Sequence, residues 1–144
     1  MARVERVNQD PNFLGKVFAV VLFGSMVNPE ADRPSDVDIA VEIIPKEADP
    51  ERARAKNERR AQEQEAKGHR FRGLMDRYDC WYREVFTHLK GRSRVVSLVD
   101  LRREGEIVWA APHQILYRAK GWKPYVPPAP PVVHPAPPVD DCPF

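Results

Sequence analysis

The sequence is poor in the residues that build disulfide frameworks and metal clusters. It has two cysteines and four histidines among its 144 residues. Cys80 and Cys142 lack the short spacing of metal ligands, and the histidines form no local cluster. We therefore expect neither a structural disulfide nor a cysteine- and histidine-based metal site, and a reducing cytoplasm fits this composition.

Long hydrophobic runs and an excess of charge of one sign are also missing. No stretch is long enough to span a membrane, and no apolar signal region follows the basic residues at the start. The formal charge of +2 gives no overall electrostatic argument for binding nucleic acid. These absences predict a soluble, cytoplasmic protein without a membrane partner, and the length of 144 residues predicts one domain.

Two strand-like stretches flank a polar loop near the start of the chain. The apolar run from Val17 to Phe23 ends abruptly at Gly24-Ser25, and the polar loop that follows contains Pro29 and Pro34. The alternation of apolar and polar residues in 36–43 is typical of a strand with one buried face. Asp36 and Asp38 therefore share one side of that strand.

This pairing of residues has a chemical meaning. Two carboxylates on one strand face can share a hard cation such as Mg²⁺, which prefers oxygen ligands and retains substrate phosphates in its shell. Gly24 and Ser25 are small enough for a ligand to approach the backbone closely. Each feature alone is more often a plain turn or a solvated strand face, but their joint appearance favours a site for a metal-bound nucleoside triphosphate.

The spacing of these residues resembles a known family. Gly24-Ser25, ten intervening residues and then Ser35-Asp36-Val37-Asp38 are similar to the motif of the polymerase-β-like nucleotidyltransferases, and most of all to their minimal nucleotidyltransferase (MNT) branch. The resemblance covers roughly residues 13–118. It implies an α/β (α+β) fold with a small mixed β-sheet and helices on one side, like the palm of polymerase β.

The resemblance also implies roles for individual residues. Asp36 and Asp38 would be the catalytic metal ligands, and Gly24, Ser25 and Ser35 would bind the nucleotide. The cofactor would be Mg²⁺, with two ions expected, and ATP would be the substrate.

The third carboxylate of such a site would come from the strand predicted at 94–101. Aligned with MNT relatives, the usual ligand position holds Ser97, and Asp100 is the only acid in the strand. Ser97 and Asp100 have opposite parity, so a regular strand cannot turn both towards the metals. Either a bulge or register shift brings Asp100 in as a catalytic metal ligand, or the site is degenerate.

Two helices are predicted between these strands. Asp49 and Pro50 are typical of a helix start, and residues 51–67 form a helix that is polar all round. Residues 51–72 contain eight Lys and Arg but only four Asp and Glu. This excess of positive charge indicates a solvated surface, or a surface that binds an acidic partner or nucleic acid. Residues 73–90 have the apolar spacing of one amphipathic helix, ended by Gly91.

The ends of the chain are less regular. Residues 1–15 predict a short or broken helix, 102–105 a turn, 106–109 a short strand or edge segment, and 115–118 a strand or part of a last helix. Nine of the fifteen prolines lie between Pro124 and Pro143. We therefore divide the chain into a nucleotidyltransferase-like domain, 1–122, and a proline-rich flexible tail, 123–144. The Pro-Pro-x-Pro-Pro run of this tail, 127–131, could bind a groove of a partner.

Three functions are compatible with these patterns. The leading one is Mg²⁺-dependent transfer of a nucleoside monophosphate, AMP from ATP, to a hydroxyl. The resemblance to stand-alone MNT antitoxins implies that this hydroxyl is a tyrosine of a HEPN-type toxin partner. The alternatives are a catalytically degenerate binding module that neutralises or scaffolds a partner, and a nucleic-acid-binding protein that uses residues 51–72. Proton transfer would fall to Asp100 or to Glu42. Glu42 lies on the same strand face as Asp36 and Asp38, which we call the aspartate face.

Overall fold

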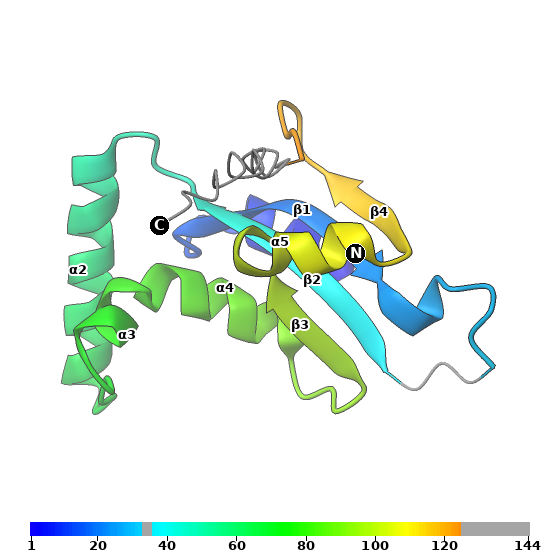
Figure 1. Ribbon diagram of the computed structural model, residues 1–144. Helices are drawn as coiled ribbons and strands as arrows, with labels where there is room; N and C mark the ends of the chain where they lie inside the picture. Colours follow the sequence, from blue (N-terminus) through cyan, green and yellow to red (C-terminus); the bar gives the residue numbers. More distant parts are fainter. Residues whose placement is uncertain (33–35, 125–144) are drawn as a thin grey trace, which may run out of the picture.

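Four strands form one mixed sheet in the computed structural model, which describes residues 1–32 and 36–124. The strands are β1 (Gly15–Phe23), β2 (Val37–Pro45), β3 (Val96–Asp100) and β4 (His113–Arg118). Their order is β3-β2-β1-β4 (Figure 1). The central β1 pairs antiparallel with β2 and β4, whereas β2 and β3 are parallel. The predicted α/β fold with a small mixed sheet is confirmed.

One face of the sheet is covered by the helices α1 (Ala2–Gln9) and α4 (Cys80–Lys90). Its core consists of aliphatic side chains from α1, β1, β2 and α4, namely Val4, Val7, Val17, Val20, Val41, Ile43 and Val85. Asn8 fixes α1 to β1 because its side-chain amide both accepts from the N–H of Val17 and donates to its carbonyl. The short helix expected near the start is therefore present.

The opposite face is covered by α5 (Leu101–Ala110), which crosses over β2 in Figure 1. Leu101 and Val108 of α5 pack on Ala40 of β2 and on Trp122. The helices therefore lie on both sides of the sheet, whereas the prediction placed them on one. The predictions of a turn at 102–105 and of a short strand or edge segment at 106–109 were wrong, since both ranges belong to α5.

The amphipathic stretch 73–90 is divided into α3 (Leu74–Tyr78) and α4, with Asp79 between them. The cause is a side chain from α2 (Pro50–Ala66), the polar helix that the sequence predicts. The buried amide of Asn57 donates to the carbonyls of Arg77 and Tyr78 and accepts from the N–H of Trp81. These bonds satisfy the backbone groups that the break exposes.

The remaining predictions concern the ends of elements. Asp49 caps α2 by accepting from the N–H of Glu51, and Gly91, with φ of 58°, ends α4. Residues 115–118 lie in a strand, β4. Within residues 1–32 and 36–124, no helix is long and apolar enough to cross a membrane. The proline-rich segment 125–144 lies outside the described residues.

Candidate active site

The two halves of the sequence motif meet where β1 ends and β2 begins. Phe23 pairs with Asp38 across these strands, and the next residue, Gly24, has φ of 80°. A Cβ built on Gly24 would lie 3.0 Å from Oδ2 of Asp38. Gly24 is therefore required twice, because its backbone is left-handed and because the Asp38 carboxylate occupies the space that a side chain would take.

The loop around this contact is held by backbone bonds. The N–H of Gly24 donates to the carbonyl of Pro112, 3.0 Å away, and η1 (Gly24–Met26) is a single 3₁₀ turn that contains Ser25. A turn of three residues has only a small dipole, so it attracts an anion less strongly than the start of a long helix does. Phosphate binding would therefore depend on the loop amides and the Ser25 hydroxyl.

Asp36 stands directly before the start of β2. It is exposed and lies two residues before Asp38. Ser35, the third residue expected at the nucleotide, lies outside the described residues.

Ser97 lies beside Asp38, where the sequence alignment placed it. The parallel pairing of β2 and β3 sets Asp38 opposite Ser97, and Ser97 is exposed. Paired residues of adjacent strands project to the same face, so Ser97 belongs to the aspartate face. A hydroxyl therefore lies beside Asp38, at the position where the family resemblance implies a third carboxylate.

Asp100 does not join the two aspartates. It pairs with Val41, and no register shift interrupts the pairing of β2 and β3. Its carboxylate lines a hollow on the α4 side of the sheet with Tyr82. Burial, and then the charge of Asp100, raise the pKa of the Tyr82 hydroxyl.

The carboxylate of Asp100 has a structural partner instead. It caps α5 by accepting from the N–H of Arg102 at 2.8 Å. The sequence left two possibilities: a bulge or register shift that brings Asp100 to the metals, or a degenerate site. Because β2 and β3 pair without a register shift, we leave Asp100 out of the site.

Glu42, the other candidate for proton transfer, lies on the aspartate face but nearer the end of β2 than Asp38 does. One of its oxygens accepts from Nε1 of Trp122 at 2.7 Å, and the other accepts from Nε of Arg102 at 3.0 Å. It lies four residues along β2 from Asp38, which corresponds to roughly 13 Å. Glu42 therefore anchors Trp122 over the core and is too far from Asp38 to serve a group bound there.

His113 was not singled out by the sequence, yet it lies on the aspartate face. It opens β4 opposite Phe23, which in turn pairs with Asp38, so the three residues form one row across the sheet. The imidazole packs edge-on against Trp109, and its Nδ1 lies 2.9 Å from the carbonyl of Ala111. A carbonyl only accepts, so Nδ1 donates, and Nε2 of the neutral ring is left as an acceptor.

Asp36 and Asp38 are the carboxylates that could hold a metal ion near Gly24. Among residues 1–32 and 36–124, no group of three or more His, Cys, Asp or Glu side chains could hold a metal ion together. Mg²⁺, however, is commonly bound through one or two carboxylates together with substrate phosphates and water. Asp36 and Asp38 fit one such shared ion better than the two that the family resemblance implies.

Comparison with known proteins addresses the same part of the chain. A family model described as "Nucleotidyltransferase domain" matches residues 4–77, slightly more than half of the 144 residues. The chain belongs to this nucleotidyltransferase family. The match includes Gly24, Asp36 and Asp38 but ends before β3, so it does not address Ser97. No curated protein and no solved structure matches the chain.

Proposed function

We propose that this nucleotidyltransferase moves a nucleoside monophosphate, AMP from ATP, to a hydroxyl group, with Mg²⁺ held by Asp36 and Asp38. The observation that carries the proposal is the contact of the Asp38 carboxylate with Gly24, which brings both halves of the motif to one point of the sheet. When bound, the cation would neutralise charge on the phosphate oxygens.

The reaction balances without a further reactant. The acceptor oxygen forms a bond to the α-phosphorus, the bond to the β-phosphate oxygen breaks, pyrophosphate leaves, and the hydroxyl proton passes to water. The protein contributes mainly by positioning: Gly24 and Ser25 provide a close backbone approach for the phosphates, and the rigid pairing of β1 with β2 fixes Asp38.

His113 has a different place in this scheme. Two strand spacings separate it from Asp38, roughly 10 Å. It is therefore too far from Asp38 to take a proton from a group bound there, but a substrate that extends across β1 would meet its Nε2. We assign His113 to orienting the substrate.

For the acceptor we propose a protein hydroxyl, the tyrosine of a HEPN-type toxin in the cytoplasm, which makes this chain an antitoxin. The proposal is supported by the resemblance of the Gly24-to-Asp38 motif to stand-alone MNT antitoxins.

A second candidate is a binding module that neutralises a partner without catalysis. The specific observation in its favour is Ser97, because a hydroxyl next to Asp38 is a poor replacement for a carboxylate at Mg²⁺.

Transfer of label from α-phosphate-labelled ATP distinguishes the two functions. The full chain, with Mg²⁺, would be added to a lysate of the source cells, beside Asp38→Asn and the matched control Asp100→Asn. We expect label on protein with the wild type and the control, and none with Asp38→Asn. A well-folded wild type that transfers no label from any of the four nucleotides would refute catalysis and favour the binding module.

A further inference from the structure

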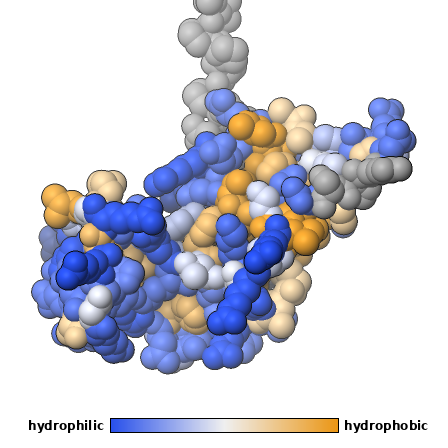
Figure 2. Space-filling model, turned by 90° about the horizontal axis from the view of Figure 1, so that it is seen from below, coloured by the Kyte–Doolittle hydropathy of each residue, from blue (hydrophilic) through white to orange (hydrophobic). Residues whose placement is uncertain are grey.

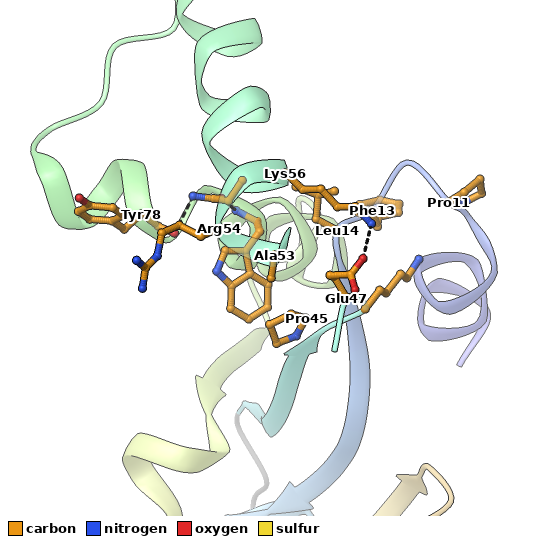
Figure 3. Close-up of a pocket in the computed structure, with 12 residues that line it drawn as sticks. Pro11, Phe13, Leu14, Pro45, Glu47, Ala53, Arg54, Lys56 and Tyr78 are labelled. Atoms are coloured by element: carbon orange, nitrogen blue, oxygen red, sulfur yellow. Dashed lines mark hydrogen bonds and ion pairs between the residues drawn. The ribbon is translucent and has the colours of Figure 1, made fainter. Parts of the chain in front are cut away.

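A recess lies at the end of the sheet opposite to the aspartates, between the α1–β1 connection, the end of β2, and the helices α2 to α4. Its volume is about 380 Å³. The walls are mainly apolar and come from Phe13, Leu14, Pro45, Ala53, Tyr78 and Trp81. Figure 3 shows Phe13 and Leu14 on one side, Tyr78 on the other, and Pro45 below. We call this cavity the recess.

The rim of the recess carries more positive than negative charge. Lys46, Arg54 and Lys56 line it, against the single carboxylate of Glu47. Lys56 is paired with Glu47 at 2.7 Å. The ion pairs found within residues 1–32 and 36–124 do not include Arg54. The rim therefore offers a cation next to an apolar cavity.

Exposed apolar side chains continue the recess onto α3. Leu74, Met75 and Tyr78 are 73%, 69% and 53% exposed, although they share a helix of five residues. Figure 2 shows hydrophobic atoms at the left end, over α2 and α3, within a hydrophilic surface. Exposed apolar side chains beside an apolar cavity favour an interaction site at this end of the molecule.

The segment 125–144 of the same chain has the matching chemistry. It contains eight prolines and four valines, it has no Lys or Arg, and its acidic residues are Asp140 and Asp141. Proline-rich sequences favour the polyproline II helix, which binds aromatic-lined grooves at a low cost in entropy. Apolar prolines fit the walls of the recess, and the two aspartates complement its rim.

The chain is long enough for this contact. Trp122 is fixed to Glu42, and Pro45 follows three residues later on β2, roughly 10 Å along the strand. The twenty residues of 125–144 span about 60 Å as polyproline II. We propose that the proline-rich segment of each chain binds in its own recess, with the prolines of 127–138 against Tyr78 and Trp81 and with Asp140 and Asp141 near Arg54.

This proposal does not depend on the proposed catalysis. The recess lies where β1 begins and β2 ends, whereas Gly24 and Asp38 lie at the other ends of these strands, roughly 25 Å away. Binding of the segment would leave the aspartate face open, and its test needs no activity.

Cys142 allows the test in the full chain. Burial raises the pKa of the Cys80 thiol to about 11, so a nitroxide reagent at neutral pH should attach to Cys142 alone, which peptide mapping would confirm. We expect the nitroxide to broaden the amide NMR signals of Ala53, Arg54 and Tyr78, and to leave those of Ile107 on α5 unchanged. Equal broadening on α3 and α5, or none at all, would overturn the proposal.

Three variants assign the contact. Tyr78→Ala removes an aromatic wall and should reduce the ratio of bound to free segment by up to about tenfold, and Arg54→Glu should reduce it by a smaller factor that shrinks with salt. Ile107→Ala, which removes an exposed apolar side chain from α5, should change nothing. Equal losses in all three variants would contradict the assignment. Arg54→Glu keeps the test valid if Tyr78→Ala disturbs the fold.

Two further samples identify the occupant. Replacing the prolines of the 127–131 run with alanine should abolish the broadening at the recess, and persistence of the effect would refute recognition of prolines. In a mixture of isotope-labelled Cys142→Ser chain with unlabelled nitroxide-carrying chain, only contacts between molecules broaden signals. We expect none, and broadening of Arg54 in the mixture would show that a second copy supplies the segment.

Discussion

Replacing Gly24 with alanine tests the contact on which the site depends. Gly24 has φ of 80°, where a residue with a Cβ costs roughly 1–2 kcal/mol, and the new methyl group would lie 3.0 Å from Oδ2 of Asp38. The carboxylate must then move. We expect Gly24→Ala to lose about 2 kcal/mol of unfolding free energy, or several degrees in Tm, and to lose nearly all nucleotidyl transfer.

Gly68→Ala is the matched control. Gly68 has φ of 89°, so alanine meets the same backbone strain, but a Cβ there would have no neighbour within 4 Å. Urea denaturation should show similar losses of stability in the two variants, whereas transfer of label from α-labelled ATP should fail in Gly24→Ala alone. If Gly24→Ala transfers label at the wild-type rate, the site does not depend on the contact between Gly24 and Asp38.

Four other variants or conditions have defined outcomes. Asn57→Ala should lower the unfolding free energy in urea by about 3 kcal/mol, since buried backbone groups between α3 and α4 lose their partner, and a loss below about 1 kcal/mol would contradict this role. Ser97→Asp should tighten Mn²⁺ binding measured by electron paramagnetic resonance, because it places a third carboxylate beside Asp38; unchanged binding would mean that Ser97 does not face the cation. Cys80, whose pKa burial raises to about 11, should resist iodoacetamide in the folded protein at mildly alkaline pH and react after unfolding, as mass spectrometry of its peptide would show. Arg77 lowers the pKa of Glu58 from its usual 4.5, so this pair stabilises the fold above that pH and the effect is lost as the pH falls through the lowered pKa; Arg77→Met should flatten the acid side of a Tm-against-pH curve, and a curve of unchanged shape would speak against the pair.

The sequence predicts those parts of the fold that local patterns determine. The apolar run of β1, the alternation of β2 and the Asp49-Pro50 start of α2 each lie within one short stretch. The position of Ser97 beside Asp38 also followed, because one alignment of β3 fixes the face of every residue in that strand.

Other features depend on contacts between distant residues. The role of Asp100 was the least predictable, because a carboxylate after a strand serves equally well as a metal ligand or as the cap of a helix. Asp100 is a helix cap because α5 follows it, and the sequence did not predict α5 because Gly105 is typical of a turn. The break between α3 and α4 depends on Asn57 from another helix, and the place of His113 depends on the pairing of β1 with β4, which contains a register shift.

The most direct test of the account compares two aspartates in metal and nucleotide binding. Mn²⁺, which is paramagnetic and replaces Mg²⁺ at oxygen sites, would be titrated into the full chain with ATP present, for the wild type, Asp38→Asn and Asp100→Asn. We predict that Asp38→Asn weakens Mn²⁺ binding about tenfold or more. Asp100→Asn should bind as the wild type does and keep its stability, because the asparagine oxygen still accepts from the N–H of Arg102 and caps α5. Unchanged binding in Asp38→Asn, or a loss confined to Asp100→Asn, would contradict the assignment of the site to the aspartate face.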